Sequence, residues 1–203
     1  MPTAAAFSTI EVLHNGQRVE IRALRPEDQE EMLAAVRRTS TQSLYRRFFT
    51  VRRHFSEAET SFFLNPDFLT HVALVAVAEQ DDKPVIAGGG RYVVIKPGQA
   101  EVAFAVVDQF QGQGIGSALL RHLSSLAREA GLREFVAEVL PENAAMLKVF
   151  EKSGLEVATR RELQTYMLYL GWHDLFKAIA PPFSHVAFDR RNDHAWLCRE
   201  ITV

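Results

Sequence analysis

Short stretches recur along the chain in which apolar and polar residues alternate or nearly every residue is apolar, and both patterns are typical of β-strands. The first two stretches flank His14-Asn15-Gly16-Gln17. Asn-Gly in that position favours a tight hairpin, because both residues tolerate positive φ. The strands predicted from these patterns span residues 10–13, 18–22, 71–79, 85–95, 101–107, 135–140 and 163–170.

Elsewhere a period of 3.6 residues replaces the alternation and predicts helices. The pattern is clearest where Ile115, Ala118 and Leu119 begin an apolar stripe that Gly131 ends. Asn143 is a suitable N-cap for a shorter helix that runs to residue 150. Further helices are predicted at residues 26–38, 40–49 and 55–64.

The order of these elements is two strands, helices, three strands, helix, strand, helix, strand, which predicts one α/β (α+β) domain over residues 1–170. Gly88-Gly89-Gly90 interrupts its fourth strand and predicts a bulge or a close backbone approach. The pattern is less regular after Gly171, where it favours a helix at 172–179 and a short strand at 195–203. We interpret residues 171–203 as a C-terminal elaboration of the same domain.

The charge balance argues against one class of partner. Lys and Arg number 23 against 25 Asp and Glu, whereas non-specific nucleic-acid binding needs a basic surface. No apolar run approaches the roughly 20 residues of a membrane-spanning helix, and the first eight residues do not resemble an export signal. Cys198 is the only cysteine, so no intramolecular disulfide can form. We expect a cytoplasmic protein that binds neither nucleic acid nor membrane.

The segment that says most about chemistry is Gln111-Gly112-Gln113-Gly114-Ile115-Gly116, between the strand at 101–107 and the long helix. Glycine permits the backbone conformation of a tight turn and lets a ligand approach the main chain. Amides at a helix N-terminus point outward, and the helix dipole favours negative charge there. The segment therefore predicts a binding site for a phosphate or a pyrophosphate.

Two common phosphate-binding motifs do not fit this segment. A P-loop requires Gly-x-x-x-x-Gly-Lys-Ser/Thr, and the segment contains no lysine. The dinucleotide motif Gly-x-Gly-x-x-Gly, started at Gly112, needs a glycine where Ser117 stands. The βαβ unit with an acidic residue about 20 positions further on, which accompanies that motif, is not evident either.

Gln111, Gly114 and Gly116 do fit Gln/Arg-x-x-Gly-x-Gly/Ala, and this pattern resembles motif A of the GNAT acetyltransferases. The resemblance covers roughly residues 18–170, since 141–146 and 150–155 look like the family's next landmark. Three other segments are similar to the acetyltransferase domain of bacterial Pat-type protein lysine acetyltransferases. They are Arg25-Pro26-Glu27-Asp28, residues 43–49 and residues 138–143.

This resemblance implies a GNAT-like, mixed and mostly antiparallel sheet, splayed at the cofactor site, with acetyl-CoA as cosubstrate. The strand backbone at 105–107 would face the pantetheine arm, and amides from residues 111–117 would bind the pyrophosphate. The implied cofactor-binding residues are Ala105, Val106, Val107, Gln111, Gly112, Gln113, Gly114, Ile115, Gly116, Ser117 and Asn143. Asn143 is equally consistent with a simple helix cap.

Transfer of an acetyl group to an amine requires a base, because only the neutral amine attacks. A partly buried carboxylate with a raised pKa suits that task. By the resemblance Glu101 is the first candidate and Glu138, on the adjoining strand, the second; both are also consistent with ordinary surface carboxylates. Many family members place a tyrosine, the general acid for the leaving thiolate, where this chain has Phe150.

We expect no metal, because His71, His122, His173 and His185 lack metal-ligand spacing with cysteine or with one another. The predicted function is that of an acetyl-CoA-dependent N-acetyltransferase acting on a primary amine, with a protein lysine favoured. A small-molecule amine is the alternative acceptor, and a non-catalytic acyl-CoA-binding sensor is the alternative outside the enzyme class. Self-association into a homo-oligomer remains open.

Overall fold

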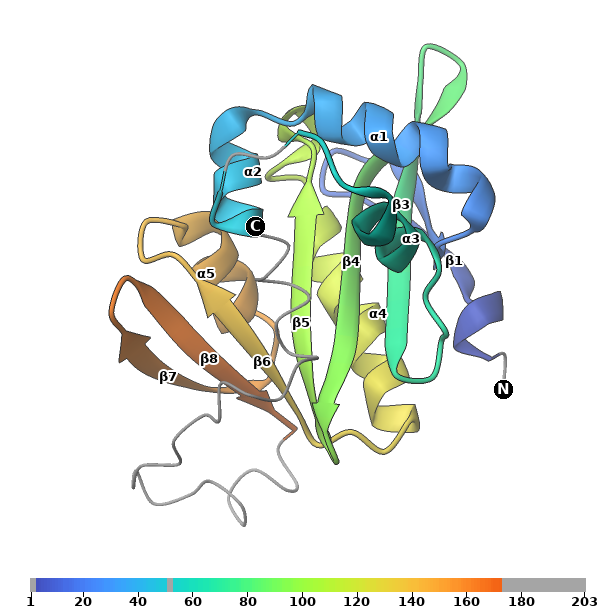
Figure 1. Ribbon diagram of the computed structural model, residues 1–203. Helices are drawn as coiled ribbons and strands as arrows, with labels where there is room; N and C mark the ends of the chain where they lie inside the picture. The colour runs from blue at the N-terminus through green and yellow to red at the C-terminus, as the bar shows by residue number, and fades with distance from the viewer. Residues whose placement is uncertain (1–2, 51–52, 173–203) are drawn as a thin grey trace.

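The computed structural model describes residues 3–50 and 53–172, in which one eight-stranded sheet carries helices on both faces (Figure 1). The strands are β1 (Ser8–Val12), β2 (Arg18–Ala23), β3 (His71–Gln80), β4 (Lys83–Lys96), β5 (Gln99–Val106), β6 (Glu134–Val139), β7 (Glu156–Glu162) and β8 (Thr165–Gly171). The helices are α1 (Gln29–Arg38), α2 (Thr41–Phe48), α3 (Glu57–Leu64), α4 (Ile115–Glu129) and α5 (Ala144–Glu151).

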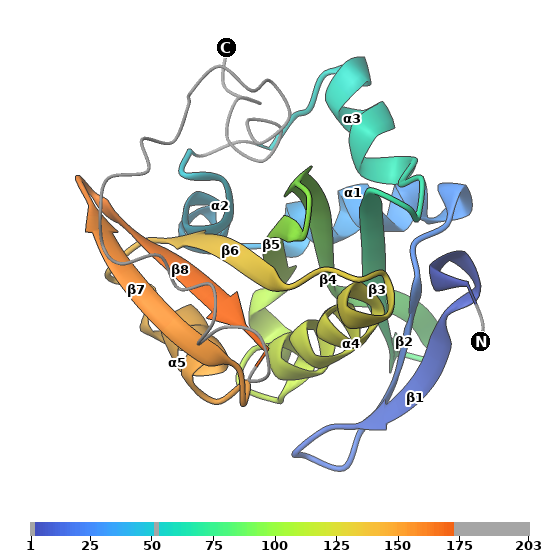
Figure 2. The same ribbon diagram turned by 90° about the horizontal axis from the view of Figure 1, so that it is seen from below.

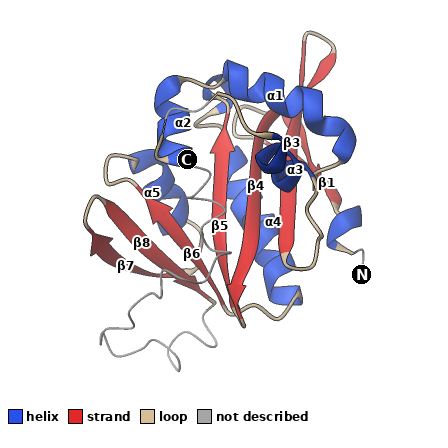
Figure 3. Cartoon of the chain, viewed as in Figure 1, coloured by secondary structure: helices blue, strands red, loops and turns tan. Residues whose placement is uncertain are grey.

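The helices divide into two layers. Figures 2 and 3 show α1, α2 and α3 on one face of the sheet and α4 and α5 on the other. The apolar stripe predicted from Ile115, Ala118 and Leu119 forms the buried face of α4, and Leu119 has no exposed surface. Burial of such a stripe against a sheet supplies most of the stability of an amphipathic helix. Prediction and structure agree for this helix.

The sheet follows the order β1-β2-β3-β4-β5-β6-β8-β7 within the described residues. Its pairs are antiparallel except for β5 and β6. The hairpin predicted at Asn15-Gly16 joins β1 to β2, and Gly16 has a φ of 84°. The expectation of a mixed, mostly antiparallel sheet between helices is confirmed.

The parallel pair β5 and β6 is short. Residues Gln99 to Glu101 pair with residues 134–136, and beyond Glu101 the two strands diverge toward α2 (Figure 1). The β6-facing edge of residues 102–106 therefore has no strand partner among the described residues, as expected of a splayed sheet. The strands are joined through α4, so the chain does contain a βαβ unit, which the sequence patterns did not reveal.

The C-terminal end of the described chain corrects one prediction. The strand expected at 163–170 begins at Thr165, and a further strand, β7, precedes it as its antiparallel partner. Leu163 lies in the connecting turn with a φ of 35° and is 93% exposed. β7 lies at the sheet edge and none of its residues is buried, so its sequence shows no alternation of apolar residues.

The close backbone approach expected at the glycine triplet is found at Gly88, and a bulge lies at Ala87, directly before the triplet. The β3–β4 register shifts between Ala76 and Val77, which is the irregularity of a bulge. A Cβ on Gly88 would lie 2.8 Å from the carbonyl oxygen of Ala105, so the neighbouring backbone approaches closely. The helix and strand expected after residue 172 lie outside the described residues, as does Cys198. Among the residues described, no helix is long and apolar enough to span a membrane.

Candidate active site

The glycine-rich turn adopts a conformation that requires glycine. Gly112 has a φ of 74° and Gly114 a φ of 103°, and Gly114 is the N-cap of α4 without a side-chain cap. The first hydrogen bond at the start of α4 runs from Ala118 N–H to Gly114 O at 3.0 Å. The consecutive N–H groups from Gly112 to Ser117 donate no hydrogen bond to any described residue. Free amides at a helix N-terminus are suited to bind an anion.

The β1–β2 hairpin braces this turn from a distant part of the sequence. His14 N–H donates to Gln113 O at 3.1 Å, and Asn15 Nδ2 donates to Gln113 Oε1 at 3.0 Å. A Cβ on residue 114 would lie 3.3 Å from both Cε1 and Nε2 of the His14 ring. Sequence reasoning did not single out His14 or Asn15 as site residues, because Asn15-Gly16 already had a role as a hairpin turn.

Gln111 and Asp108 tie the same turn to α2. Gln111 Nε2 donates to Val106 O at 2.9 Å and to Ser43 Oγ at 3.1 Å, so its side chain holds the turn to β5 and to α2. Asp108 Oδ1 accepts from Ser40 Oγ (2.6 Å) and Ser43 Oγ (2.9 Å). Burial raises the pKa of the Asp108 carboxyl, but these hydrogen bonds outweigh it and leave the pKa below its usual range. We assign Gln111 and Asp108 to positioning of the turn.

Where β5 and β6 part, a pocket opens that brings the other predicted residues together. Glu101 comes from β5, Glu138 from β6 and Asn143 from the start of α5, and all three line this splay pocket. Both glutamates are partly buried, and Glu138 Oε1 accepts a hydrogen bond from Thr165 Oγ1 at 2.7 Å. Two carboxylates beside an opened strand edge are groups that can take a proton from an amine.

The opposite wall of the splay pocket comes from α2 and the residue that follows it. Arg46, Arg47 and Phe49 line it, and Arg46 Nε is buried with no hydrogen-bond partner in the described chain. A buried donor without a partner is costly, which favours a ligand acceptor at this place. The sequence predicts a helix here and a likeness to Pat-type domains, but no spacing pattern marks Arg46 itself.

Asn143 shows both features expected of it. Its Oδ1 accepts from Met146 N–H at 3.2 Å, which makes it the N-cap of α5, and the residue is also buried at the pocket wall. Phe150 packs against Phe104 with ring centroids 5.5 Å apart and carries no hydroxyl to donate a proton. Burial raises the pKa of Tyr169 on β8, and this residue is not among the described residues that line the pocket.

The described histidines do not form a metal site. His71 is buried, stacks on Phe62 and contacts Arg91 through Nε2 at 3.1 Å. Burial, with the positive charge of Arg91, lowers the pKa of His71 to about 4, so the ring is a neutral core group. No cluster of three His, Cys, Asp or Glu side chains that could hold a metal ion occurs within residues 3–50 and 53–172.

Comparison with known proteins places this chain in a family. The sequence profile of the Acetyltransferase (GNAT) family matches residues 38–155. The chain is also 32% identical over 138 residues to Acetyltransferase PA5475 of Pseudomonas aeruginosa, which is 68% of this chain and 74% of that protein. The chain belongs to the Acetyltransferase (GNAT) family. It is an acetyltransferase by that membership, as its glycine-rich turn indicated.

Two further GNAT relatives are Pat proteins. The chain is 36% identical over 169 residues to Acetyltransferase Pat of Mycolicibacterium smegmatis and spans 49% of that protein's length. The crystal structure of the GNAT domain of S. lividans PAT superposes with a TM-score of 0.73 at 33% identity, covering 81% of this chain and 97% of that domain. A more distant fold neighbour, yncA from Salmonella typhimurium, was solved with its cofactor acetyl-CoA (TM-score 0.56, 19% identity).

Proposed function

We propose that this GNAT protein transfers an acetyl group from acetyl-CoA to a primary amine, with the lysine side chain of a protein as the first acceptor to test. The observation that carries the proposal is the combination of two features. Free backbone amides from Gly112 to Ser117 surround the N-terminus of α4, and two carboxylates, Glu101 and Glu138, line the splay pocket. The likeness to Pat proteins supports the choice of lysine.

The residues present fit coenzyme A. The amides at the α4 N-terminus suit its diphosphate, because the helix dipole and the unsatisfied N–H groups both favour negative charge. The β6-facing edge of β5 beyond Glu101 has no strand partner among the described residues, and it suits the amide groups of the pantetheine arm, which can hydrogen-bond as a neighbouring strand would. Of the residues expected there, Val106 already accepts from Gln111 Nε2 through its carbonyl oxygen, and Val107 N–H donates to Ala87 O. Arg46 Nε is a donor still available in the pocket. When bound, the thioester supplies an acetyl group activated for transfer.

Glu101 is our candidate for the general base. It stands at the last β5–β6 pair, where the strands begin to part, and its side chain lines the splay pocket. A carboxylate there can take the proton of an incoming ammonium, so that the neutral amine attacks the acetyl carbon. Glu138 lines the same pocket from β6 and is the second candidate.

Protonation of the departing thiolate needs no side-chain acid in this proposal. Phe150 has no hydroxyl, and it is buried against Phe104. A thiol has an ordinary pKa of about 8.5, so a thiolate is a good leaving group that water can protonate near neutral pH. We therefore propose direct transfer with a glutamate base and solvent as the proton source.

The test follows free coenzyme A released from acetyl-CoA, with lysine-bearing proteins and small amines as acceptors. Glu101→Gln should lower kcat by about 10²–10⁴-fold while the Kd for acetyl-CoA, measured by calorimetry, stays unchanged. Glu142→Gln is the matched control, because Glu142 is an exposed neighbour of Asn143 outside the pocket lining. If only small amines are acetylated, the proposal of a protein lysine as the acceptor is wrong and a small-molecule amine takes its place. Binding without turnover on any acceptor would refute the transferase and favour an acyl-CoA sensor.

A further inference from the structure

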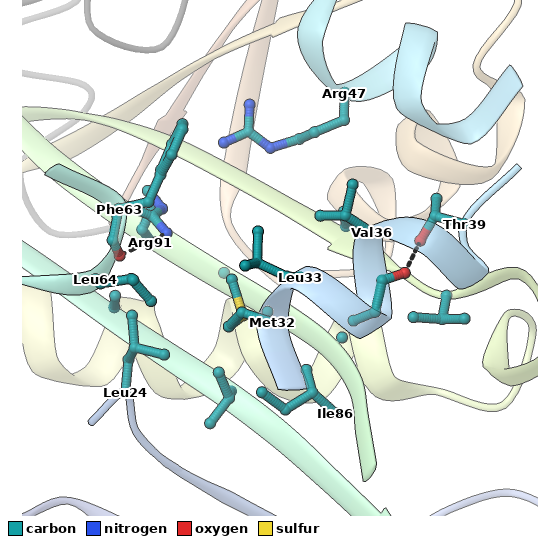
Figure 4. A pocket seen from close by; sticks show the side chains of 18 of the residues that line it. Leu24, Met32, Leu33, Val36, Thr39, Arg47, Phe63, Leu64, Ile86 and Arg91 are labelled. Atoms are coloured by element: carbon teal, nitrogen blue, oxygen red, sulfur yellow. Dashed lines mark hydrogen bonds between the residues drawn. The ribbon is translucent and has the colours of Figure 1, made fainter. Parts of the chain in front are cut away.

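A second pocket lies between the sheet and the three helices of the α1–α3 layer. Its walls are Leu33 and Val36 of α1, Phe48 of α2 and Phe63 and Leu64 of α3. Figure 4 shows Leu33 and Val36 projecting from α1 toward the space and Arg47 reaching across it from α2. The lining is mostly apolar, with Gln29, Thr39, Thr60 and two arginines as its polar members, and we call this space the apolar pocket.

The apolar pocket exists because small residues form its floor. In the sheet register, Ala103 of β5 stands opposite Arg91 of β4, and Ala105 stands opposite Gly89. Ala73 of β3 continues the first of these rows. Alanine and glycine at these places leave space beneath α1 that larger strand residues would fill, since interiors otherwise pack to near-crystalline density.

The two pockets adjoin. Arg47 and Ala103 line both the splay pocket and the apolar pocket. Glu101, Ala103 and Ala105 alternate along β5, and residues two apart on a strand point to the same face of the sheet. A group held beside Glu101 therefore has a continuous path over two alanines into the apolar pocket.

The charges around the apolar pocket favour a neutral hydrocarbon chain over an alkylammonium acceptor as its occupant. The described residues that line the apolar pocket include two arginines, Arg47 and Arg91, and no carboxylate. An alkylammonium acceptor would lose its hydration there and meet only like charge, which is unfavourable in a low-dielectric site. The carboxylates that would attract it, Glu101 and Glu138, lie in the splay pocket. A neutral hydrocarbon chain meets no such penalty.

We propose that the apolar pocket receives the acyl chain of the donor, so that the protein binds and transfers straight-chain acyl groups longer than acetyl. This inference rests on the proposed function, and the same bonds break and form in both. The acyl C–S bond breaks and the acyl C–N bond forms. The ammonium gives one proton to Glu101 before attack, the attacking nitrogen gives a second proton to solvent as the amide forms, and coenzyme A leaves as the thiolate, which solvent protonates. Only the length of the chain beyond the carbonyl carbon differs.

Calorimetric titration of the protein with coenzyme A and with its acetyl, butyryl, hexanoyl and octanoyl thioesters tests the inference without requiring turnover. Burial of each added methylene should lower the Kd by about fourfold while the chain lies within the pocket. Val36→Trp, which fills the pocket from its wall, should remove most of that gain and leave the Kd for acetyl-CoA within about twofold. Val12→Trp is the matched control, because Val12 is 66% exposed on β1.

The outcomes separate the two proposals. Failure of every thioester and of coenzyme A to bind would refute the proposed function itself. Binding of acetyl-CoA with no gain for longer chains would overturn the apolar-pocket inference alone. A Val36→Trp protein that keeps the chain-length gain but shows a raised KM for the amine would also overturn it and assign the pocket to the acceptor. Leu33→Trp, checked by circular dichroism, replaces Val36→Trp if that variant does not fold.

Discussion

The imidazole ring of His14 lies against the Cα of Gly114, and Cε1 and Nε2 stand 3.3 Å from the place a Cβ would occupy. Gly114 also has a φ of 103°, which side chains rarely tolerate. Two separate constraints therefore require glycine at the start of α4. One is local to the turn, and the other comes from a hairpin a hundred residues earlier in the sequence.

Gly114→Ala should damage the turn on both grounds. We expect roughly 1–3 kcal/mol of lost stability from backbone strain and at least tenfold weaker binding of coenzyme A, since the amides from Gly112 to Ser117 would shift. Gly112→Ala is the control: its φ of 74° is strained too, but its Cβ would meet nothing within 4 Å. Equal effects of the two substitutions on the Kd would contradict a role for the His14 contact.

Asp108→Ala should remove the hydrogen bonds that hold α2 to the glycine-rich turn. The substitution removes the acceptor for Ser40 N–H, Ser40 Oγ and Ser43 Oγ, and because these hydrogen bonds are exposed, each contributes about 0.5–1.5 kcal/mol. We expect faster amide exchange in α2 and a higher Kd for acetyl-CoA. Gln109→Ala, on the same turn, breaks only an exposed bond to Gln80 and should change neither quantity.

The glycine triplet of β4 allows a matched pair of substitutions. A Cβ on Gly90 would lie 3.0 Å from Leu123 Cδ1 and 3.1 Å from Phe104 Cβ, so Gly90→Ala should overpack the α4 face and cost about 1–3 kcal/mol. A Cβ on Gly89 would meet its nearest atom at 3.5 Å, an ordinary contact. Gly89→Ala should be neutral, or stabilise by up to about 1 kcal/mol. Urea denaturation of both variants measures the difference; a reversed order would refute this packing.

His71 should make the fold sensitive to acid between pH 6.5 and 4. The unfolded chain binds a proton at this residue near pH 6.5, whereas the folded protein does so only near pH 4. The unfolded state therefore binds more protons in this window, and stability falls as pH falls, by roughly 3 kcal/mol at most. His71→Gln should flatten that slope in denaturation curves, and His54→Gln, an exposed control, should not.

The sequence predicted what depends on local pattern. Hydrophobic period and glycine placement located the β1–β2 hairpin, α4 and the turn at Gly112 and Gly114, and the resemblance to the GNAT family placed Glu101 and Glu138 where the structure has them lining one pocket. Each of these signals lies within a few residues of the element it describes. Assignment of Glu101 as the base stays a prediction.

What the sequence could not predict depends on contacts between distant polar residues. Asn15 and Gln113 meet across 98 positions, and Ser40 and Asp108 across 68. Neither pair leaves a periodic pattern, because a single polar side chain is as common on a solvated surface as in a contact. β7 was missed for a related reason, since its backbone pairs with β8 while none of its side chains is buried.

The charged residues that kept β7 from being predicted as a strand have a physical consequence at the edge of the sheet. An outermost strand offers an open row of amides and carbonyls on which another chain could stack and grow into an aggregate. Glu156, Arg160, Arg161 and Glu162 place charges of both signs along that rim. Charged edges of this kind discourage such growth, so replacing Arg160 and Arg161 with valine should make the protein precipitate at lower concentration.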